Sequence, residues 1–215
     1  SRGLGDVYKR QNLMQSDYRR LERVVRYFRE HGCLPDDFQS HEYRRSNYTC
    51  TLPSKDIADW RAKFHAVPPL QTLTTTRWGD KAPRVAILLV EGFLLYFDAQ
   101  LRQQYDVRIY LRISGETMFQ RRIARSNYIL DDGTVWSDPP GYFEKIVWPS
   151  YVEANARMFE NHDVEHGAPC LPSEDDSSDG GPIHKMQLIE ADHLSARDVC
   201  DRACTILYKN IWLDK

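Results

Sequence analysis

The sequence predicts an α/β protein with a doubly wound parallel sheet. Two short apolar runs rich in β-branched residues, Arg84 to Val90 and Val107 to Ile113, are typical of strands buried on both faces of a sheet. A third short strand is predicted at Met186 to Glu190. Because helical patterns alternate with these strands, they favour a sheet of parallel strands covered by helices.

Apolar residues at three- and four-residue steps predict helices before, between and after the strands. Ser114 is placed to cap one of them, and Gly32 to end another. The expected helices are Asp17 to His31, Ser54 to Phe64, Asp98 to Tyr105, the helix after Ser114, Tyr142 to Glu160, and Ser195 to Asn210.

Charge and hydropathy exclude several classes of protein. The 215 residues include 29 Lys and Arg and 31 Asp and Glu, which gives a formal net charge of -2. The chain therefore has no strong electrostatic field of one sign that would favour binding to nucleic acid or to an anionic membrane. The longest apolar run, Val85 to Val90, is far shorter than the roughly 20 residues of a membrane span. The 5 cysteines form no CxxC pair. We therefore expect a soluble, cytoplasmic protein with a small-molecule partner.

Composition also predicts the organisation of the chain. Residues 1–11 (SRGLGDVYKRQ) look like a non-native leader, and residues 12–215 are predicted to form a single, incomplete domain. A turn-rich segment at about 126–141 is typical of a mobile lid. The segment at about 161–182, with SEDDSSDGGP as its core, is predicted to be an acidic linker.

Glu91 is the first candidate for chemistry, because it directly follows the predicted strand Arg84 to Val90. Ligands of open α/β sheets lie beyond the carboxyl ends of the strands. A carboxylate held there needs a cation or a hydrogen bond, which a metal-bound water or a ligand hydroxyl could provide. The alternative is that Glu91 only caps the next turn, and spacing alone supports both interpretations equally.

Arg121, Arg122 and Arg125 fall within five residues at one helix end. The planar guanidinium donates parallel hydrogen bonds to phosphate. A solvated basic face at a helix C-terminus is the alternative, and the lid that follows favours phosphate binding. Tyr128, on that lid and outside helical spacing, is a candidate for stacking on a flat heterocycle.

Three segments together resemble the nicotinamide riboside kinases, within the uridine-kinase-like branch of P-loop kinases. They are ILLVEGFLLYFD (Ile87 to Asp98), RRIARSNY (Arg121 to Tyr128) and DPPGYFEKIVWPSYV (Asp138 to Val152). The resemblance covers about Asp17 to Asn210. EGFLL alone indicates only the wider branch, and its combination with the other two segments is much more specific.

The resemblance implies transfer of the ATP γ-phosphate, with Mg²⁺, to the 5′-hydroxyl of nicotinamide riboside, on a salvage route to NAD. The resemblance assigns Glu91 to the catalytic centre, where the Glu91 carboxylate contacts the metal through a water molecule. Arg122 matches the arginine that holds the ribose hydroxyls, and Tyr128 the tyrosine that packs on the nicotinamide ring. Arg121 and Arg125 match lid arginines on the ATP side.

Two parts of the family pattern are missing from the sequence. It holds no Gly-Lys dipeptide, so the GxxxxGK[ST] phosphate loop is absent. Asp36 and Asp37 follow the first helix instead of preceding it, so neither is assigned as the catalytic aspartate of the family. The resemblance also implies that the phosphate-loop strand is missing from the centre of the sheet.

We therefore expect kinase activity of a full-length parent protein and none of the 215-residue chain. Two alternatives stay open: another nucleoside kinase of the same branch, and a non-catalytic protein that binds a nucleoside or a partner. A GxxxxGK[ST] loop in the upstream reading frame would favour a kinase.

Overall fold

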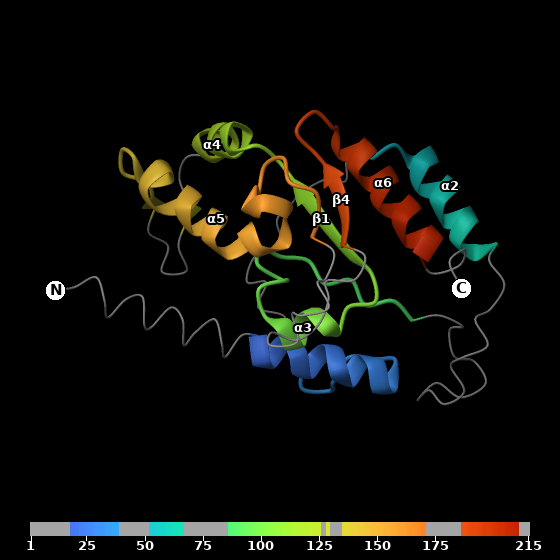
Figure 1. The fold of residues 1–215 in the computed structure, drawn as a ribbon. Coiled ribbons are helices and arrows are strands. Elements are labelled where there is room, and N and C mark those ends of the chain that lie inside the picture. The colour runs from blue at the N-terminus through green and yellow to red at the C-terminus, as the bar shows by residue number, and fades with distance from the viewer. Residues whose placement is uncertain are drawn as a thin grey trace. The chain divides into compact units, whose positions relative to one another are not determined.

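The computed structural model describes residues 18–38, 52–66, 86–125, 128–129, 135–170 and 186–210 (Figure 1). The chain divides into two compact units, Ser1–Asp106 and Val107–Lys215, and each is described by itself. Within the described ranges, no helix is long and apolar enough to cross a membrane. The single domain expected over residues 12–215 stays a prediction.

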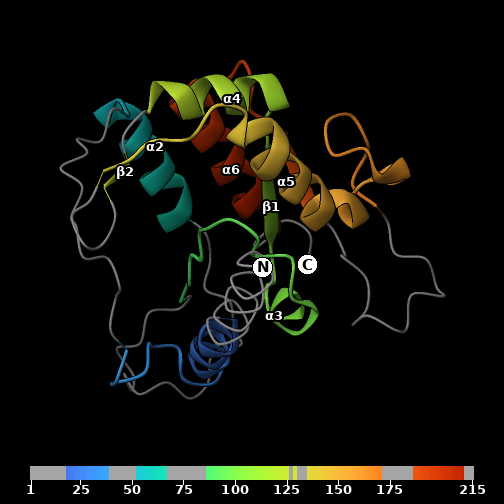
Figure 2. The same cartoon turned by 90° about the vertical axis from the view of Figure 1, so that its left-hand side faces the viewer.

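The second unit is built on two parallel strands. β1 (Arg108–Arg112) pairs with β4 (Met186–Glu190) in a register that runs from Arg108↔Met186 to Arg112↔Glu190. Both strands and the α/β class were predicted, whereas a doubly wound order over more strands stays a prediction. Figures 1 and 2 show the strand pair between α5 (Trp148–Asn155) and α6 (Ala196–Tyr208).

Alternation along the strands decides which side chains meet each helix. Tyr110 points toward α5, where its hydroxyl lies 2.8 Å from the hydroxyl of Tyr151 and donates to Oδ1 of Asn155 at 3.1 Å. The ring of Phe159 meets Tyr110 edge-on at 5.3 Å. Ile189, 1% exposed, lies on the other face of the pair. The core of the second unit therefore lies against α5 on one face of the pair and around Ile189 of β4 on the other.

The predicted helix Tyr142 to Glu160 is not uniform. A π-helical segment, η2 (Phe143–Val147), leads directly into α5, and a 3₁₀ turn, η3 (Ala156–Met158), ends the run. Pro149 near the start of α5 has no N–H to donate to the preceding turn, and its ring crowds that turn. The wider π turn lies next to this interruption, as is common where a helix ladder is disturbed.

Residues 161–170 were predicted to begin the acidic linker, and they are folded. We call residues 159–170 the capping loop. It contains the 3₁₀ turn η4 (Glu160–His162), and a bridge between Phe159 and Pro169 closes it. Phe159 and Val164 are 1% and 4% exposed, so apolar burial holds the loop against the core. The remainder of the predicted linker, 171–182, lies outside the described residues.

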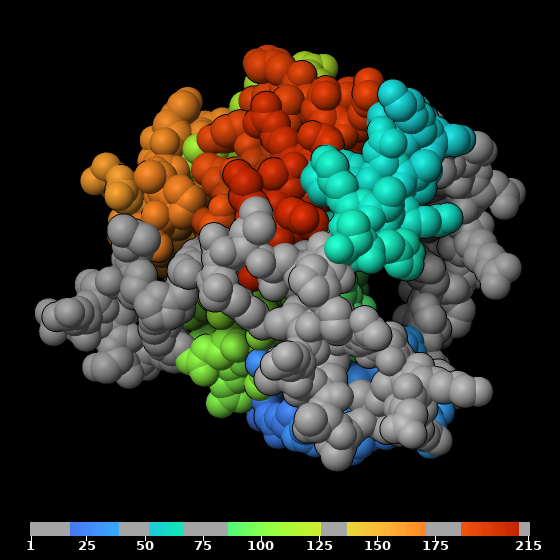
Figure 3. Space-filling view, turned by 90° about the vertical axis from the view of Figure 1, so that its right-hand side faces the viewer, coloured from blue at the N-terminus to red at the C-terminus, as the bar shows by residue number. Residues whose placement is uncertain are grey.

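The closing helix α6 begins at a capping box. The Ser195 hydroxyl accepts from the backbone N–H of Asp198 at 3.2 Å, and the Asp198 carboxylate accepts from the N–H of Ser195 at 3.2 Å. Both groups would otherwise be unsatisfied at the helix start. Figure 3 shows the atoms of α6 as a continuous part of the molecular surface.

The first unit holds the helix over residues 18–31, α2 (Ser54–His65) and α3 (Ala99–Gln103). Val24, Val25 and Leu101 are its most buried aliphatic side chains, at 5%, 3% and 0% exposure. The first helix ends as predicted at Gly32, whose φ of +68° suits a residue without a Cβ. α2, in contrast, buries none of its side chains.

The strand predicted at Arg84 to Val90 does not form in its described part, residues 86–90. Ile87 is 54% exposed and Leu89 is 77% exposed. A strand needs a neighbour to receive its backbone hydrogen bonds, and among the described residues β1 pairs only with β4. The apolar run was identified correctly, but the prediction of a strand buried on both faces was wrong at 86–90.

Part of the predicted lid, 126–141, is also described. β2 (Tyr128–Ile129) and β3 (Val135–Trp136) form an antiparallel pair with Tyr128 opposite Trp136. The lid therefore includes a short hairpin-like pairing, and its mobility stays a prediction.

Burial predicts unequal effects for two neighbouring aliphatic residues. Leu111 and Ile189 are partners in the strand register, yet Leu111 is 53% exposed and Ile189 is 1% exposed. We expect Ile189→Ala to lower the free energy of unfolding by about 2 to 5 kcal/mol, because it leaves a cavity. Leu111→Ala is the matched control, with an expected loss below about 1.5 kcal/mol. Urea unfolding measures both, and equal losses would contradict this packing.

Candidate functional site

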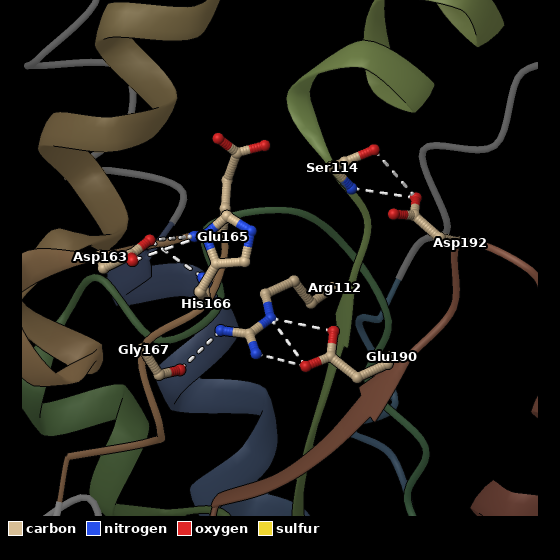
Figure 4. Close-up of polar contacts among 8 residues, drawn as sticks. All are labelled: Arg112, Ser114, Asp163, Glu165, His166, Gly167, Glu190 and Asp192. Carbon is tan, nitrogen blue, oxygen red and sulfur yellow. Dashed lines mark hydrogen bonds and ion pairs between the residues drawn. The ribbon is translucent and has the colours of Figure 1, made fainter.

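The carboxyl ends of β1 and β4 meet at an ion pair between a buried arginine and an exposed glutamate. Arg112 is the last residue of β1 and Glu190 the last of β4. Nε of Arg112 donates to both carboxylate oxygens of Glu190, at 3.1 and 3.0 Å, and Nη1 donates to the carbonyl of Gly167 at 2.6 Å (Figure 4). The guanidinium also lies 5.1 Å from the centre of the Phe159 ring. One buried cation thus joins both strands to the capping loop.

Beyond this edge begins α4 (Gly115–Ala124), the helix that carries the three arginines. Ser114 is its N-cap, as predicted, and its hydroxyl accepts from the N–H of Thr117 at 3.2 Å. The carboxylate of Asp192 accepts from the N–H of Ser114 at 3.0 Å, and that of Glu165 from the N–H of Gly115 at 2.8 Å. Two carboxylates therefore face the positive end of the helix dipole.

Hydrogen bonding shifts the titration of Asp192. Burial raises the pKa of this carboxyl, but hydrogen bonds from the Ser114 backbone and from the Thr117 and Ser114 hydroxyls outweigh burial and place its pKa below the ordinary value. The carboxylate is therefore ionised at neutral pH and complements the helix N-terminus.

Arg122 is held in a second ion pair. Its Nη2 donates to Oδ1 of Asp138 at 3.0 Å and its Nε to Oδ2, a two-pronged contact between partly buried side chains. The guanidinium lies 5.8 Å from the centre of the Tyr142 ring. This arrangement presents a carboxylate oxygen and guanidinium N–H groups within one small area.

Arg121 and Arg125 lie at the same end of α4, and both are exposed. Arg125 is the C-cap, and its Nε donates to the carbonyl of Arg121 at 3.2 Å. Arg121 also lines a mostly apolar hollow of about 560 Å³. The other lining residues come from the end of β1, the loop after β4 and the start of α6: Leu111, Ile113, Ala191, Leu194, Ala196, Val199 and Cys200.

Glu91 and Tyr128 are described less fully than the arginines. Glu91 is exposed and lies in an irregular stretch of the first unit. Nearby, Leu94 has a φ of +60°, and its carbonyl accepts from the hydroxyl of Tyr18 at 2.9 Å. Tyr128 lies in β2 of the second unit, where its backbone is described. The roles of Glu91 and Tyr128 stay predictions.

Mg²⁺ is the metal that the resemblance to kinases implies. No group of three or more His, Cys, Asp or Glu side chains gathers in this part of the chain. Mg²⁺ is usually held by one or two carboxylates together with waters and substrate phosphates. Glu91 offers a single exposed carboxylate, and its water-mediated contact with Mg²⁺ stays a prediction.

Five residues of the site were not singled out from the sequence: Arg112, Asp138, Glu165, Glu190 and Asp192. Asp138 lies in the DPPGYF motif, and Asp192 follows the third predicted strand by two residues. Both positions could therefore have been identified from the sequence as candidate site residues. No sequence feature distinguished Glu165, because an acidic residue within an acidic stretch is normally interpreted as solvent-exposed. Its partner, Gly115, is 50 residues away in the sequence.

The Asp192 contacts predict a pH dependence of stability. We expect Asp192→Ala to lower the free energy of unfolding by about 0.5 to 2 kcal/mol at pH 7, as for other losses at a helix N-terminus. Because the folded-state pKa is lowered, the contribution of the charge is complete above about pH 4 and is lost as pH falls through the folded pKa. Urea unfolding from pH 7 to pH 3 should show the difference from wild type narrowing, and a constant difference would contradict the assignment.

Comparisons with known proteins give sequence relatives only. No protein-family model matches the chain, and no solved structure matches it. A nicotinamide riboside kinase of Schizosaccharomyces pombe is 32% identical over 140 residues, 65% of this chain and 54% of the relative. That of Eremothecium gossypii is 43% identical over 79 residues, 37% of this chain and 32% of the relative.

The same similarity extends to mammals. Nicotinamide riboside kinase 2 of Homo sapiens is 40% identical over 75 residues, 35% of this chain and 30% of the relative. The matched part of the chain thus spans between about a third and about half of these relatives. Fungal and mammalian relatives carry the same name, as the three sequence segments predicted. Over its aligned part, the chain is similar to the nicotinamide riboside kinases of fungi and mammals.

Proposed function

We propose that the whole protein transfers the γ-phosphoryl group of ATP to nicotinamide riboside and releases the mononucleotide. Kinship with proteins named for this activity supports the proposal. The structural observation that carries it is the arginine-bearing helix α4, which begins beside the carboxyl ends of two parallel strands. Phosphoryl transfer depends mainly on positioning and on stabilisation of charge on the phosphate oxygens.

The Arg122 and Asp138 pair suits the ribose side of the reaction. A vicinal diol offers two donors and two acceptors, and the pair presents an acceptor carboxylate beside donor N–H groups. We propose that the ribose hydroxyls bind these two side chains. Tyr128 is proposed to pack on the nicotinamide ring, because an aromatic face attracts a flat cation.

Arg121, Arg125 and the adjoining hollow suit the ATP side. Their side chains are exposed, so they are accessible to phosphate oxygens. The apolar lining of the hollow fits a flat base, with Arg121 at its edge. Bound Mg²⁺ would neutralise charge on the phosphates, and Glu91 is proposed to hold it through a water. A cytoplasmic location stays a prediction.

The proposed reaction balances as a direct transfer. The 5′-oxygen of the riboside forms a bond to the γ-phosphorus, the bond from that phosphorus to the β–γ bridging oxygen breaks, and ADP leaves. The hydroxyl proton passes to a base that we do not assign within this chain. The arginines stabilise the charge on the transferred group without accepting or donating a proton, since they stay charged at working pH.

A substrate panel tests the proposal. The full-length protein is incubated with ATP, Mg²⁺ and, in parallel, nicotinamide riboside, uridine and other ribosides, and ADP release is measured. We expect the highest kcat/KM with nicotinamide riboside, and the 215-residue chain serves as the comparison in which no turnover is expected. Preference for uridine would favour another nucleoside kinase. Binding of nicotinamide riboside without turnover would favour the non-catalytic alternative.

Two substitutions test the assigned centre of the proposed reaction. In the full-length protein, Arg122→Ala and Glu91→Ala should each lower kcat/KM by about 10² or more, because each removes a charged contact to bound substrate or metal. Arg202→Ala, on the exposed side of α6, is a matched control of the same charge change. Wild-type rates in either test variant, with the fold intact by circular dichroism, would remove that residue from the site.

Substitution of Arg121 should weaken the binding of ATP more than the binding of nicotinamide riboside. Loss of a charge-assisted hydrogen bond costs about 1.5 to 3 kcal/mol, so Arg121→Ala should raise KM for ATP by about tenfold or more. KM for nicotinamide riboside should change little, since Arg122 is retained. Steady-state kinetics with each substrate varied in turn measures both values. A rise confined to the riboside would reverse the assignment of the two arginines.

A further inference from the structure

The capping loop is a rigid element, closed by its own hydrogen bonds. The carboxylate of Asp163 accepts from the N–H groups of Glu165 and His166, both at 2.9 Å. The N–H of Glu160 donates to the carbonyl of Ala168 at 2.9 Å. A Cβ added at Gly167 would lie 2.5 Å from the carbonyl oxygen of Asp163, so the backbone there is packed too closely for a side chain.

This rigid loop is attached to the strand edge and to the helix. Arg112 donates to the carbonyl of Gly167, which ties the loop to the ends of β1 and β4. Two residues earlier, the carboxylate of Glu165 accepts from the N–H of Gly115, the first residue of α4. Figure 4 shows Glu165 and Gly167 on the loop, Arg112 on β1, and Ser114 at the start of α4.

The backbone at the start of α4 also packs against a second element. A Cβ added at Gly115 would lie 3.0 Å from the ring of Trp148, so the backbone of α4 lies directly against that indole. Glu165 is partly buried where it accepts from the Gly115 N–H. It holds one end of a helix whose backbone already packs against α5.

We propose that Glu165 is a positioning residue for the arginines of α4, acting through the backbone of the helix. α4 rises about 1.5 Å per residue, which places Arg125 about 15 Å from the attachment at Gly115. A tilt of about 10° at the attachment would move that far end by about 2 to 3 Å. A shift of about 1 Å in a substrate-positioning group can already cost about 10² in rate.

This inference rests on the proposed kinase function, and it adds a part of the molecule that touches neither substrate. The capping loop sets the direction of α4, and α4 sets where the guanidinium groups lie. Glu165 should therefore affect catalysis only as far as the arginines contribute to it.

The test compares three variants of the full-length protein. Glu165→Ala removes the acceptor for the Gly115 N–H, Glu165→Gln keeps a side-chain oxygen there, and Glu160→Ala removes an exposed carboxylate from the same loop. We expect kcat/KM to fall by about 10-fold to 10²-fold in Glu165→Ala. Glu165→Gln should stay within about threefold of wild type, and Glu160→Ala should match wild type.

A double-mutant cycle separates positioning from a general loss of structure. In a background of Arg121→Ala, Arg122→Ala and Arg125→Ala, adding Glu165→Ala should reduce the remaining kcat/KM by less than about threefold, because the arginines that Glu165 positions are then absent. A full, additive loss would overturn the proposal, and so would wild-type kinetics of Glu165→Ala.

Hydrogen exchange keeps this test independent of the proposed activity. Exchange of the amides at residues 115–118 should be faster in Glu165→Ala than in Glu165→Gln or Glu160→Ala. If the wild-type protein phosphorylates no nucleoside, the proposed function fails, and faster exchange still supports the attachment of α4 by the loop. Unchanged exchange in Glu165→Ala would overturn the attachment whether or not the protein is a kinase.

Discussion

The buried guanidinium of Arg112 is the contact on which the second unit depends. Its side chain is 5% exposed, and a buried charge is costly unless a counter-charge and hydrogen-bond acceptors surround it. Glu190 provides the counter-charge, the carbonyl of Gly167 a further acceptor, and the Phe159 ring a polarisable face. These partners come from β4 and the capping loop. Satisfying one cation therefore holds together two segments that are distant in the sequence.

The start of α4 follows from that arrangement. Asp192 lies just after β4 and Glu165 lies in the capping loop, so the two segments held by Arg112 also supply the carboxylates at the helix N-terminus. The other end of the helix carries arginines. Negative side chains at the start and positive ones at the end both interact favourably with the helix dipole. The helix is thus oriented by charge at its start, and it carries exposed cations at Arg121 and Arg125.

Local patterns predicted most elements of the second unit because those elements depend on nearby residues. The strands at 108–112 and 186–190 lie within the predicted apolar runs, and Ser114 and Ser195 cap helices as expected. The capping loop was missed for a physical reason. Glu165 acts through Gly115, 50 residues away in the sequence, and no local spacing reveals that contact. At 86–90, in contrast, a strand was predicted that does not form. Apolar composition cannot supply the neighbouring strand whose backbone groups a strand needs for its hydrogen bonds.

The sequence by itself determined the α/β class, the positions of the arginine helix and of the two paired strands, and the resemblance to nicotinamide riboside kinases. Each of these depends on residue types at short spacing. Only the tertiary structure decided that Arg122 is paired with Asp138, that Arg121 lines a hollow, and that Glu165 contacts the first residue of α4. Such contacts depend on where folding brings distant segments. The role of a charged side chain, structural or ligand-binding, is set by the group that forms a hydrogen bond or ion pair with it.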